Sequence, residues 1–180
     1  MDVPREMLVA LPGSTGDIYL RHQQVWKVMS PYVKRGADFL YVLVGEHMAR
    51  VRSEYLDRGV SAPRQGTDFV AALVTGRRRA IDQKITSVPE CELGQWLQLL
   101  LSEHGMVLQE FGVIRRYQAT GLKVDRGQNS RQRIELPITD FSLRVKIANA
   151  ARADEAWRRG LGRHKRFGFG MLRSASNEAK

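Results

Sequence analysis

Cysteine is almost missing from this sequence of 180 residues, because Cys91 is the only one. A single cysteine excludes an intramolecular disulfide and a zinc site built from a cluster of thiolates. The sequence has four histidines, which lie far apart and show none of the spacings typical of metal ligands: His22, His47, His104 and His164. We therefore expect a protein whose chemistry needs neither a metal ion nor another cofactor.

Long apolar runs are missing as well. No stretch reaches the roughly 18 apolar residues that cross a bilayer. The chain also does not open with a charged segment followed by an apolar one, as a secretory leader does. The sequence therefore predicts a cytoplasmic protein with no membrane partner.

Acidic residues are scarce relative to basic ones. The chain has 19 Asp and Glu against 29 Lys and Arg, so its formal net charge is +10, and its sequence pI is near 10.2. An excess of this size favours a polyanionic partner, since each phosphate that a cation neutralises releases counterions. Nucleic acid is the first candidate, and an acidic membrane surface is the second.

The apolar pattern predicts an α+β protein. Strands are expected over 7–11, 39–44, 49–53, 69–75, 106–117 and 141–147. Helices are expected from Ile18 to Gly36, from Pro89 to Gly105 and from Ala150 to Arg159. This order fits tandem ferredoxin-like (RRM-like) units, an N-terminal one over 1–66 and a C-terminal one over 67–180. The connector 54–66 gives the first unit no second helix.

The segment 160–173, "GLGRHKRFGFGMLR", has four glycines and four Lys or Arg. It is either a helix C-cap followed by an ordinary loop and a terminal strand, or a loop whose backbone lets phosphates approach closely. The chemistry favours binding to a nucleic-acid backbone. The candidate RNA-binding residues here are Gly162, Arg163, His164, Lys165 and Arg166, and His164 is also a rival for any catalytic role.

A second basic region is predicted to form a hairpin with its tip at 125–129. It contains one acid, Asp125, and six cations: Arg115, Arg116, Lys123, Arg126, Arg131 and Arg133. A two-stranded projection of this kind can enter the groove of an RNA stem. The alternative is a solvated loop. The triplet 77–79 is either a second phosphate track or an exposed charge run.

Four stretches together resemble the CRISPR repeat-processing endoribonucleases of the CasE type, which are subunits of the Cascade complex and belong to the RAMP superfamily. The glycine-rich motif is similar over Gly160-Leu161-Gly162, Lys165 and 168–172. The other similar stretches follow in the family's order, at 17–26 ("DIYLRHQQVW"), 95–97 ("QWL") and 140–143 ("DFSL"). The basic hairpin lies where the family grips the stem-loop of the repeat.

The resemblance implies a metal-independent endoribonuclease. In this family the 2′-hydroxyl attacks the adjacent phosphodiester, leaving a 2′,3′-cyclic phosphate, and the enzyme stays bound to the product hairpin. The implied catalytic residues are His22 as general acid or base, Tyr19 one turn away, and Lys27 near the scissile phosphate. The implied partners are the CRISPR repeat RNA stem-loop and other subunits of a CRISPR effector complex.

Two other functions remain open from the residues. His22 lies close to Ile18, Val25 and Met29 on a helical wheel, so it is either catalytic or a buried core histidine. In the second case the protein is a non-catalytic RNA-hairpin-binding subunit of the same fold. A weaker third candidate is a DNA-binding accessory protein.

Overall fold

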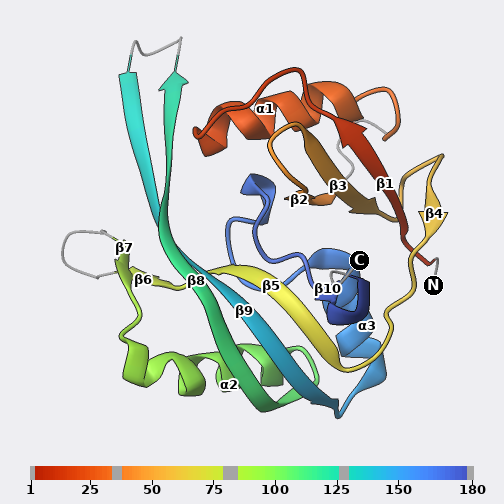
Figure 1. Ribbon diagram of the computed structural model, residues 1–180, viewed down its shortest axis with the longest axis vertical. Coiled ribbons are helices and arrows are strands. Elements are labelled where there is room, and N and C mark those ends of the chain that lie inside the picture. The colour runs from red at the N-terminus through yellow and green to blue at the C-terminus, as the bar shows by residue number, and fades with distance from the viewer. Residues whose placement is uncertain (1–2, 34–37, 79–84, 126–129, 178–180) are drawn as a thin grey trace.

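The computed structural model describes residues 3–33, 38–78, 85–125 and 130–177. Two antiparallel four-stranded sheets make up most of it, one from each half of the chain, together with a small two-stranded ribbon. Figure 1 shows the N-terminal sheet above the C-terminal one, with the last segments of the chain running between them. The predicted α+β class and ferredoxin-like arrangement are therefore confirmed. The division at residue 66 stays a proposal.

The N-terminal sheet has the strand order β2-β3-β1-β4. Its elements are β1 (Arg5–Ala10), α1 (Ile18–Met29), β2 (Leu40–Leu43), β3 (Met48–Ser53) and β4 (Val60–Ser61). Val25 and Met29 of α1 are fully buried against Val9 and Val51 of the sheet. No helix lies between β3 and β4, as expected, but the short strand β4 was not predicted from the connector.

Helix α1 ends earlier than predicted. Its last residue is Met29, and the N–H of Ser30 donates to the carbonyl of Trp26 at 2.9 Å. Pro31 follows, and because it has no backbone N–H it cannot donate the next hydrogen bond of the helix. The predicted end at Gly36 lies outside the described residues and is wrong in any case. Trp26, on the last turn of α1, is 38% exposed.

The C-terminal sheet has the strand order β10-β5-β9-β8 and a complete βαββαβ chain path. Its elements are β5 (Asp68–Val74), α2 (Leu93–Glu103), β8 (Met106–Asp125), β9 (Ser130–Ile147), α3 (Ala150–Arg159) and β10 (Arg173–Ser174). The remaining elements are β6 (Gly76–Arg78), β7 (Ile85–Ser87) and the short 3₁₀ helices η1 (Glu90–Glu92), η2 (Lys165–Phe167) and η3 (Ala175–Asn177). Phe69, Leu97, Phe141 and Trp157 belong to its core.

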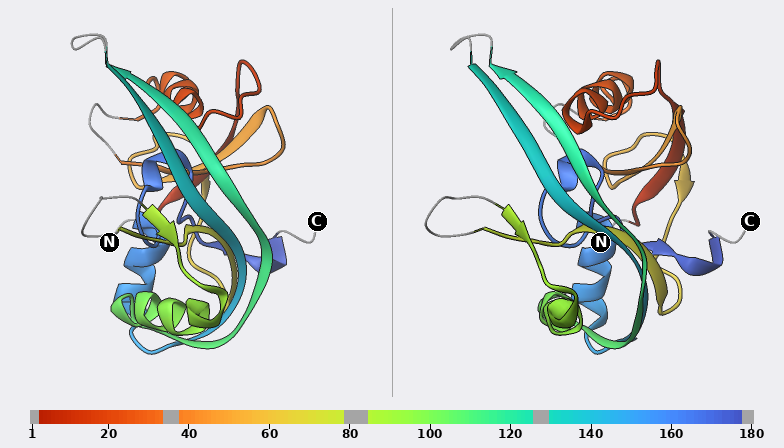
Figure 2. Two further views of the ribbon diagram at one scale, coloured as in Figure 1. Left: turned by 90° about the vertical axis from the view of Figure 1, so that its left-hand side faces the viewer. Right: turned by 60° about the vertical axis from the view of Figure 1, so that its left-hand side comes forward.

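Strands β8 and β9 are much longer than predicted. They pair as antiparallel strands from Met106 opposite Ile147 to Asp125 opposite Ser130. The register shifts twice along this pairing, near Leu108 and near Val113. Figure 2 shows the distal half of this hairpin projecting beyond the sheet and passing α1. The projecting half keeps one partly apolar face, where Ala119, Leu136 and Ile138 are buried together with Ile18 of α1, while basic residues and a glycine interrupt this pattern nearer the tip.

The strand predicted after the glycine-rich segment is nearly absent, since β10 has two residues. The apolar side chains before it are buried all the same, with Phe169 6% exposed and Leu172 fully buried. Their alternation comes from an irregular segment that fills the space between the sheets. The prediction of an ordinary terminal strand is therefore wrong.

A buried arginine joins the two halves. The guanidinium of Arg52 on β3 pairs with Glu6 on β1, with 2.5 Å from Nη2 to Oε1, and donates through Nη1 to the carbonyl of Trp157 at 2.8 Å. It also lies 3.5 Å from the centre of the Trp157 ring. Burial lowers the pKa of Arg52 to about 10. Since Trp157 is on α3, this group links the N-terminal sheet to the C-terminal unit.

Candidate functional site

The candidate site forms where α1 meets the glycine-rich segment. The ring of Phe167, on η2, lies 5.9 Å from the ring of His22 in an edge-on arrangement and 6.5 Å from the ring of Tyr19. The ring of His164 stacks on the same phenylalanine at 6.2 Å. The two histidines that the sequence left as rivals therefore belong to one cluster. Phe167 was not predicted as part of it.

His22 is half-buried, and its surroundings favour the neutral form of its imidazole. Burial lowers the pKa of its imidazole, a hydrogen bond with the backbone of Arg166 raises it, and the charge of Arg166 lowers it again. Its Nδ1 is buried and has no hydrogen-bond partner among the described residues. A neutral imidazole at this place can accept a proton from a hydroxyl group. The contact with Phe167 also fits the alternative of a histidine at the edge of the core.

Helix α1 is fixed at its N-terminus by Asp17. Asp17 Oδ1 accepts from the backbone N–H of Tyr19 at 2.8 Å and of Leu20 at 2.9 Å, which caps the helix. Asp17 Oδ2 accepts from the backbone N–H of Leu122, on β8, at 2.8 Å. A Cβ added at Gly121 would lie 2.8 Å from Ile18 Cγ1, so the helix and the hairpin touch closely here. One carboxylate thus connects the helix of His22 to the basic hairpin.

Three of the four glycines in the glycine-rich segment serve packing inside the protein. A Cβ at Gly168 would lie 2.7 Å from the ring of Tyr41, and one at Gly170 would lie 2.1 Å from the carbonyl oxygen of Leu161. Gly160 meets the carbonyl oxygen of Gly170 in the same way, at 2.8 Å. Gly162 alone of the four would place a Cβ more than 4 Å from every described atom it could meet. The close approach of phosphates is therefore proposed only at Gly162.

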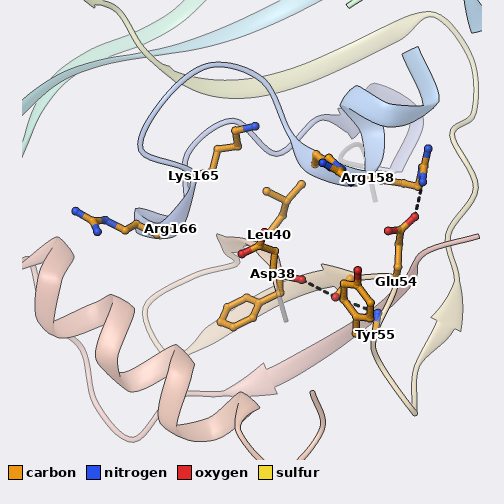
Figure 3. A pocket seen from close by; sticks show the side chains of 10 residues that line it. Asp38, Leu40, Glu54, Tyr55, Arg158, Lys165 and Arg166 are labelled. Carbon is orange, nitrogen blue, oxygen red and sulfur yellow. Dashed lines mark hydrogen bonds and ion pairs between the residues drawn. The ribbon is translucent and has the colours of Figure 1, made fainter. Parts of the chain in front are cut away.

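Cations of this segment border a pocket that Figure 3 shows, with Lys165 and Arg166 on one side and Glu54 and Tyr55 on the other. Lys165 Nζ donates to the carbonyl of Gly160 at 3.1 Å, and burial lowers the pKa of this amine. Arg166 is exposed, with its guanidinium 4.8 Å from the centre of the Phe167 ring. Arg163 is exposed as well.

Lys27 lies outside the cluster around Phe167. It lies on the last turn of α1, five residues after His22, which is about 140° around the helix axis. Its side chain is exposed and makes no hydrogen bond or ion pair with any described residue. Its expected place near the reacting phosphate stays a prediction.

The cations of the hairpin fall into two groups. At its base, Arg115 pairs with Asp140 at 2.8 Å, and Arg116 donates to Ser87 Oγ and to the Val88 carbonyl, both at 2.9 Å. The exposed cations nearer the tip are Lys123, Arg131 and Arg133, of which Arg133 pairs with Glu135 at 2.6 Å. Arg126 lies outside the described residues. In the 77–79 triplet, Arg77 pairs with Glu92 at 2.5 Å.

No group of three or more His, Cys, Asp or Glu side chains within the described residues is arranged to hold a metal ion. None of the helices found there is both long and apolar enough to cross a membrane.

The chain is similar to a known protein family in sequence and to known proteins in fold. The model of a family described as CRISPR associated protein matches residues 59–175. The fold is similar to that of a CRISPR endoribonuclease Cse3 bound to a 19 nt RNA, with a TM-score of 0.70 and 20% identity over 94% of this chain and 97% of that one. No curated protein sequence matches the chain.

Two further solved structures have the same fold over the same shares of both chains, 94% and 97%. One is Thermus thermophilus Cse3 bound to an RNA representing a pre-cleavage complex, with a TM-score of 0.66 and 19% identity. The other is the CRISPR-associated protein Cas6e from Escherichia coli K-12, with a TM-score of 0.61 and 16% identity.

Proposed function

The chain belongs to the CRISPR associated protein family, since the family model covers 59–175, and on that premise we propose that it is an endoribonuclease that processes CRISPR repeat RNA. The observation that carries the proposal is the cluster of Tyr19, His22 and His164 around Phe167. It lies on a fold that Cse3 structures bound to RNA share.

The proposed reaction needs no metal. Neutral His22 takes the proton from a 2′-hydroxyl, whose oxygen attacks the adjacent phosphorus while the bond from phosphorus to the 5′ oxygen breaks. The products are a 2′,3′-cyclic phosphate and a 5′-hydroxyl, which receives its proton from a donor in the site. Arg166, next to Phe167, supplies positive charge to the pentacoordinate phosphorus, and the long side chain of Lys27 is a second source.

The proposed substrate is the stem-loop of a CRISPR repeat. Its stem lies along the hairpin β8–β9, whose exposed cations Lys123, Arg131 and Arg133 contact phosphates. The solvent-facing cations of the glycine-rich segment, Arg163 and Arg166, are further candidates for phosphate contacts. After cleavage the enzyme holds the product hairpin and joins other subunits of a CRISPR effector complex, as the similar chain in a CRISPR RNA-guided surveillance complex suggests.

The experiment that tests this function compares wild type, His22→Ala and His164→Ala on a labelled CRISPR repeat hairpin in excess EDTA. We expect wild type to cut once and leave a cyclic phosphate, and His22→Ala to bind the hairpin without cutting it. His164→Ala separates the two histidines of the cluster, since it retains the proposed base. Cleavage by His22→Ala at the wild-type rate would contradict the proposed role of His22.

A non-catalytic RNA-hairpin-binding protein is the second candidate function. The half-burial of His22 against Phe167 favours it, because a histidine in such a contact also serves packing. Tight binding of the hairpin by wild type and His22→Ala, with no cleavage by either, is the result that this function predicts.

A further inference from the structure

A hollow of about 420 Å³ lies beside the cluster, between the N-terminal sheet and the long hairpin. Residues from both halves of the chain line it, among them Arg21, Tyr41, Arg115, Asp140, Phe167 and Arg173. It adjoins His22 in two ways. Phe167 contacts the imidazole and also lines the hollow, and Arg21 directly precedes His22 on α1.

Two buried polar atoms at this hollow are unmatched within the part of the chain that the structure describes. One is the hydroxyl of Tyr41, a residue that is 1% exposed, and the other is Oδ1 of Asp140. Burying a polar atom without a partner is unfavourable, and native proteins keep few such atoms. Both residues line the same hollow, so a ligand that enters it and displaces the side chains covering these two atoms would supply their missing partners.

The charges at the hollow favour an anion. Three arginines line it, Arg21, Arg115 and Arg173, against the single carboxylate of Asp140. Arg115 pairs with Asp140 through Nε and Nη2, and its side chain is 65% exposed. An exposed side chain of this kind can turn toward an incoming phosphate and so uncover Asp140.

A bare phosphate does not satisfy the hollow, because the free oxygen of Asp140 accepts hydrogen bonds and would repel another anion. That oxygen accepts from an N–H or O–H donor, and the edge of a nucleobase carries N–H donors. The aromatic side chains that line the hollow include Tyr41, Tyr117 and Phe167, and bases stack on such rings. Arginines, ring faces and an acceptor together match one nucleotide.

We propose that this hollow receives one unpaired nucleotide of the bound RNA, next to the phosphate that lies at His22. The base places an amino group against Asp140 and the Tyr41 hydroxyl, and its phosphate meets the arginines. Guanine, adenine and cytosine carry such an amino group, whereas uracil has none and offers only its N3–H, which lies between two carbonyl oxygens that the carboxylate would repel. The inference rests on the proposed RNA processing and names one contact that it makes.

The test measures binding, so it does not depend on cleavage. One abasic residue is placed in turn at each nucleotide at the foot of a CRISPR repeat hairpin and in its flanking strands. The affinity of each RNA is measured for wild type, Tyr41→Phe and Asp140→Asn. The matched controls are Tyr32→Phe, a tyrosine beside Arg58, and Asp68→Asn, which pairs with Arg144 on the same sheet away from the hollow.

We expect one abasic position to weaken binding to wild type about tenfold. The same position should cost little in Tyr41→Phe and Asp140→Asn, because these variants have already lost the contact, while the two controls behave as wild type. The melting temperature of Tyr41→Phe should be unchanged or raised, since an unmatched hydroxyl is removed. A purely structural role for Tyr41 would lower it.

Two results would overturn the proposal. In the first, every abasic position costs the same in the variants as in wild type. In the second, free nucleoside monophosphates bind with a dependence on Tyr41 that the hairpin RNA lacks, which would make the hollow a site for a free nucleotide. A hairpin that is bound through Tyr41 but never cut would support the hollow and contradict the proposed cleavage.

Discussion

The ring of Phe167 lies at the centre of the candidate site, although the sequence did not mark this residue as part of it. Tyr19 and His22 could be named from their resemblance to a family helix, and their spacing places both near one side of α1. Phe167 could not be named, because a phenylalanine in an alternating apolar run indicates a strand or a core. Its ring brings His164 together with Tyr19 and His22, which lie 142 or more positions earlier in the chain, and only tertiary packing specifies such a contact.

The lowered pKa of His22 gives a prediction at this scale. If neutral His22 is the base, the cleavage rate rises with pH as the imidazole loses its proton. Burial shifts that pKa below 6.5, so the rate should reach half its maximum below pH 6.5 and stay level through neutral pH. Single-turnover cleavage of the repeat hairpin across this range measures it. A rate that falls as pH rises through the acidic range would contradict a base at His22.

At the scale of elements, Asp17 makes the helix and the hairpin one unit. Its first oxygen caps α1 and its second holds the Leu122 N–H, so the backbone of the hairpin is tied directly to the helix that carries His22. Asp is a residue type that often caps helices. The sequence gives no sign of the second contact, since Leu122 is 105 residues away.

Two substitutions of Asp17 separate these contacts. Asp17→Asn keeps one oxygen to cap the helix but loses an acceptor, so we expect slower cleavage with little loss of stability. Asp17→Ala removes both contacts and should also destabilise the protein by about 1 kcal/mol. Denaturant unfolding and single-turnover cleavage are measured on both variants. Equal stability losses in the two variants would mean that the cap is not the stabilising contact.

The exposed cations of the hairpin yield a second prediction for elements. Strand alternation puts Arg131 and Arg133 on one face of the hairpin and Lys123 on the other. A hairpin in the groove of a stem meets phosphates with both faces. Lys123→Ala should therefore weaken RNA binding whatever the stem sequence, and reduce the salt dependence by about one counterion. Arg131→Ala should do the same.

The control for these variants is Arg144→Gln, on the same strand β9. Arg144 is held by two acids, Asp68 and Glu110, each at 2.8 Å. Its loss should leave the affinity for RNA and its salt dependence as in wild type. Salt-dependent binding curves with unchanged slopes for Lys123→Ala and Arg131→Ala would argue against the hairpin as the stem-binding element.

At the scale of the whole molecule, the buried side chain of Arg52 connects the two halves of the chain. It is 1% exposed and connects Glu6 on β1 with the carbonyl and ring of Trp157 on α3. Arg52→Ala would leave the Glu6 carboxylate and that carbonyl without their donor, so we expect a loss of about 3 kcal/mol in unfolding free energy. Arg52→Lys retains the positive charge but lacks the planar guanidinium with its several N–H donors. This variant should recover part of the lost unfolding free energy. Denaturant unfolding measures both.

The sequence predicts most of this architecture but not the contacts that connect its parts. The class, the order of the elements and the missing second helix of the first unit follow from local patterns of apolar residues and turns. The end of α1 could have been predicted from Pro31. The length of the hairpin and the contact between Arg52 and Trp157 could not, because both depend on partners far away in the chain.

The continuous pairing of β8 and β9 from Arg115 to Asp125 also bears on how such a protein can evolve. Because side chains alternate between the faces of a strand, adding one residue to each strand near the tip lengthens the arm and keeps every pair nearer the sheet in register. A single inserted residue would instead require a bulge or exchange the faces beyond it. The arm can therefore change its reach in paired steps, and adapt to stems of different length, while the sheet that anchors it stays as it is.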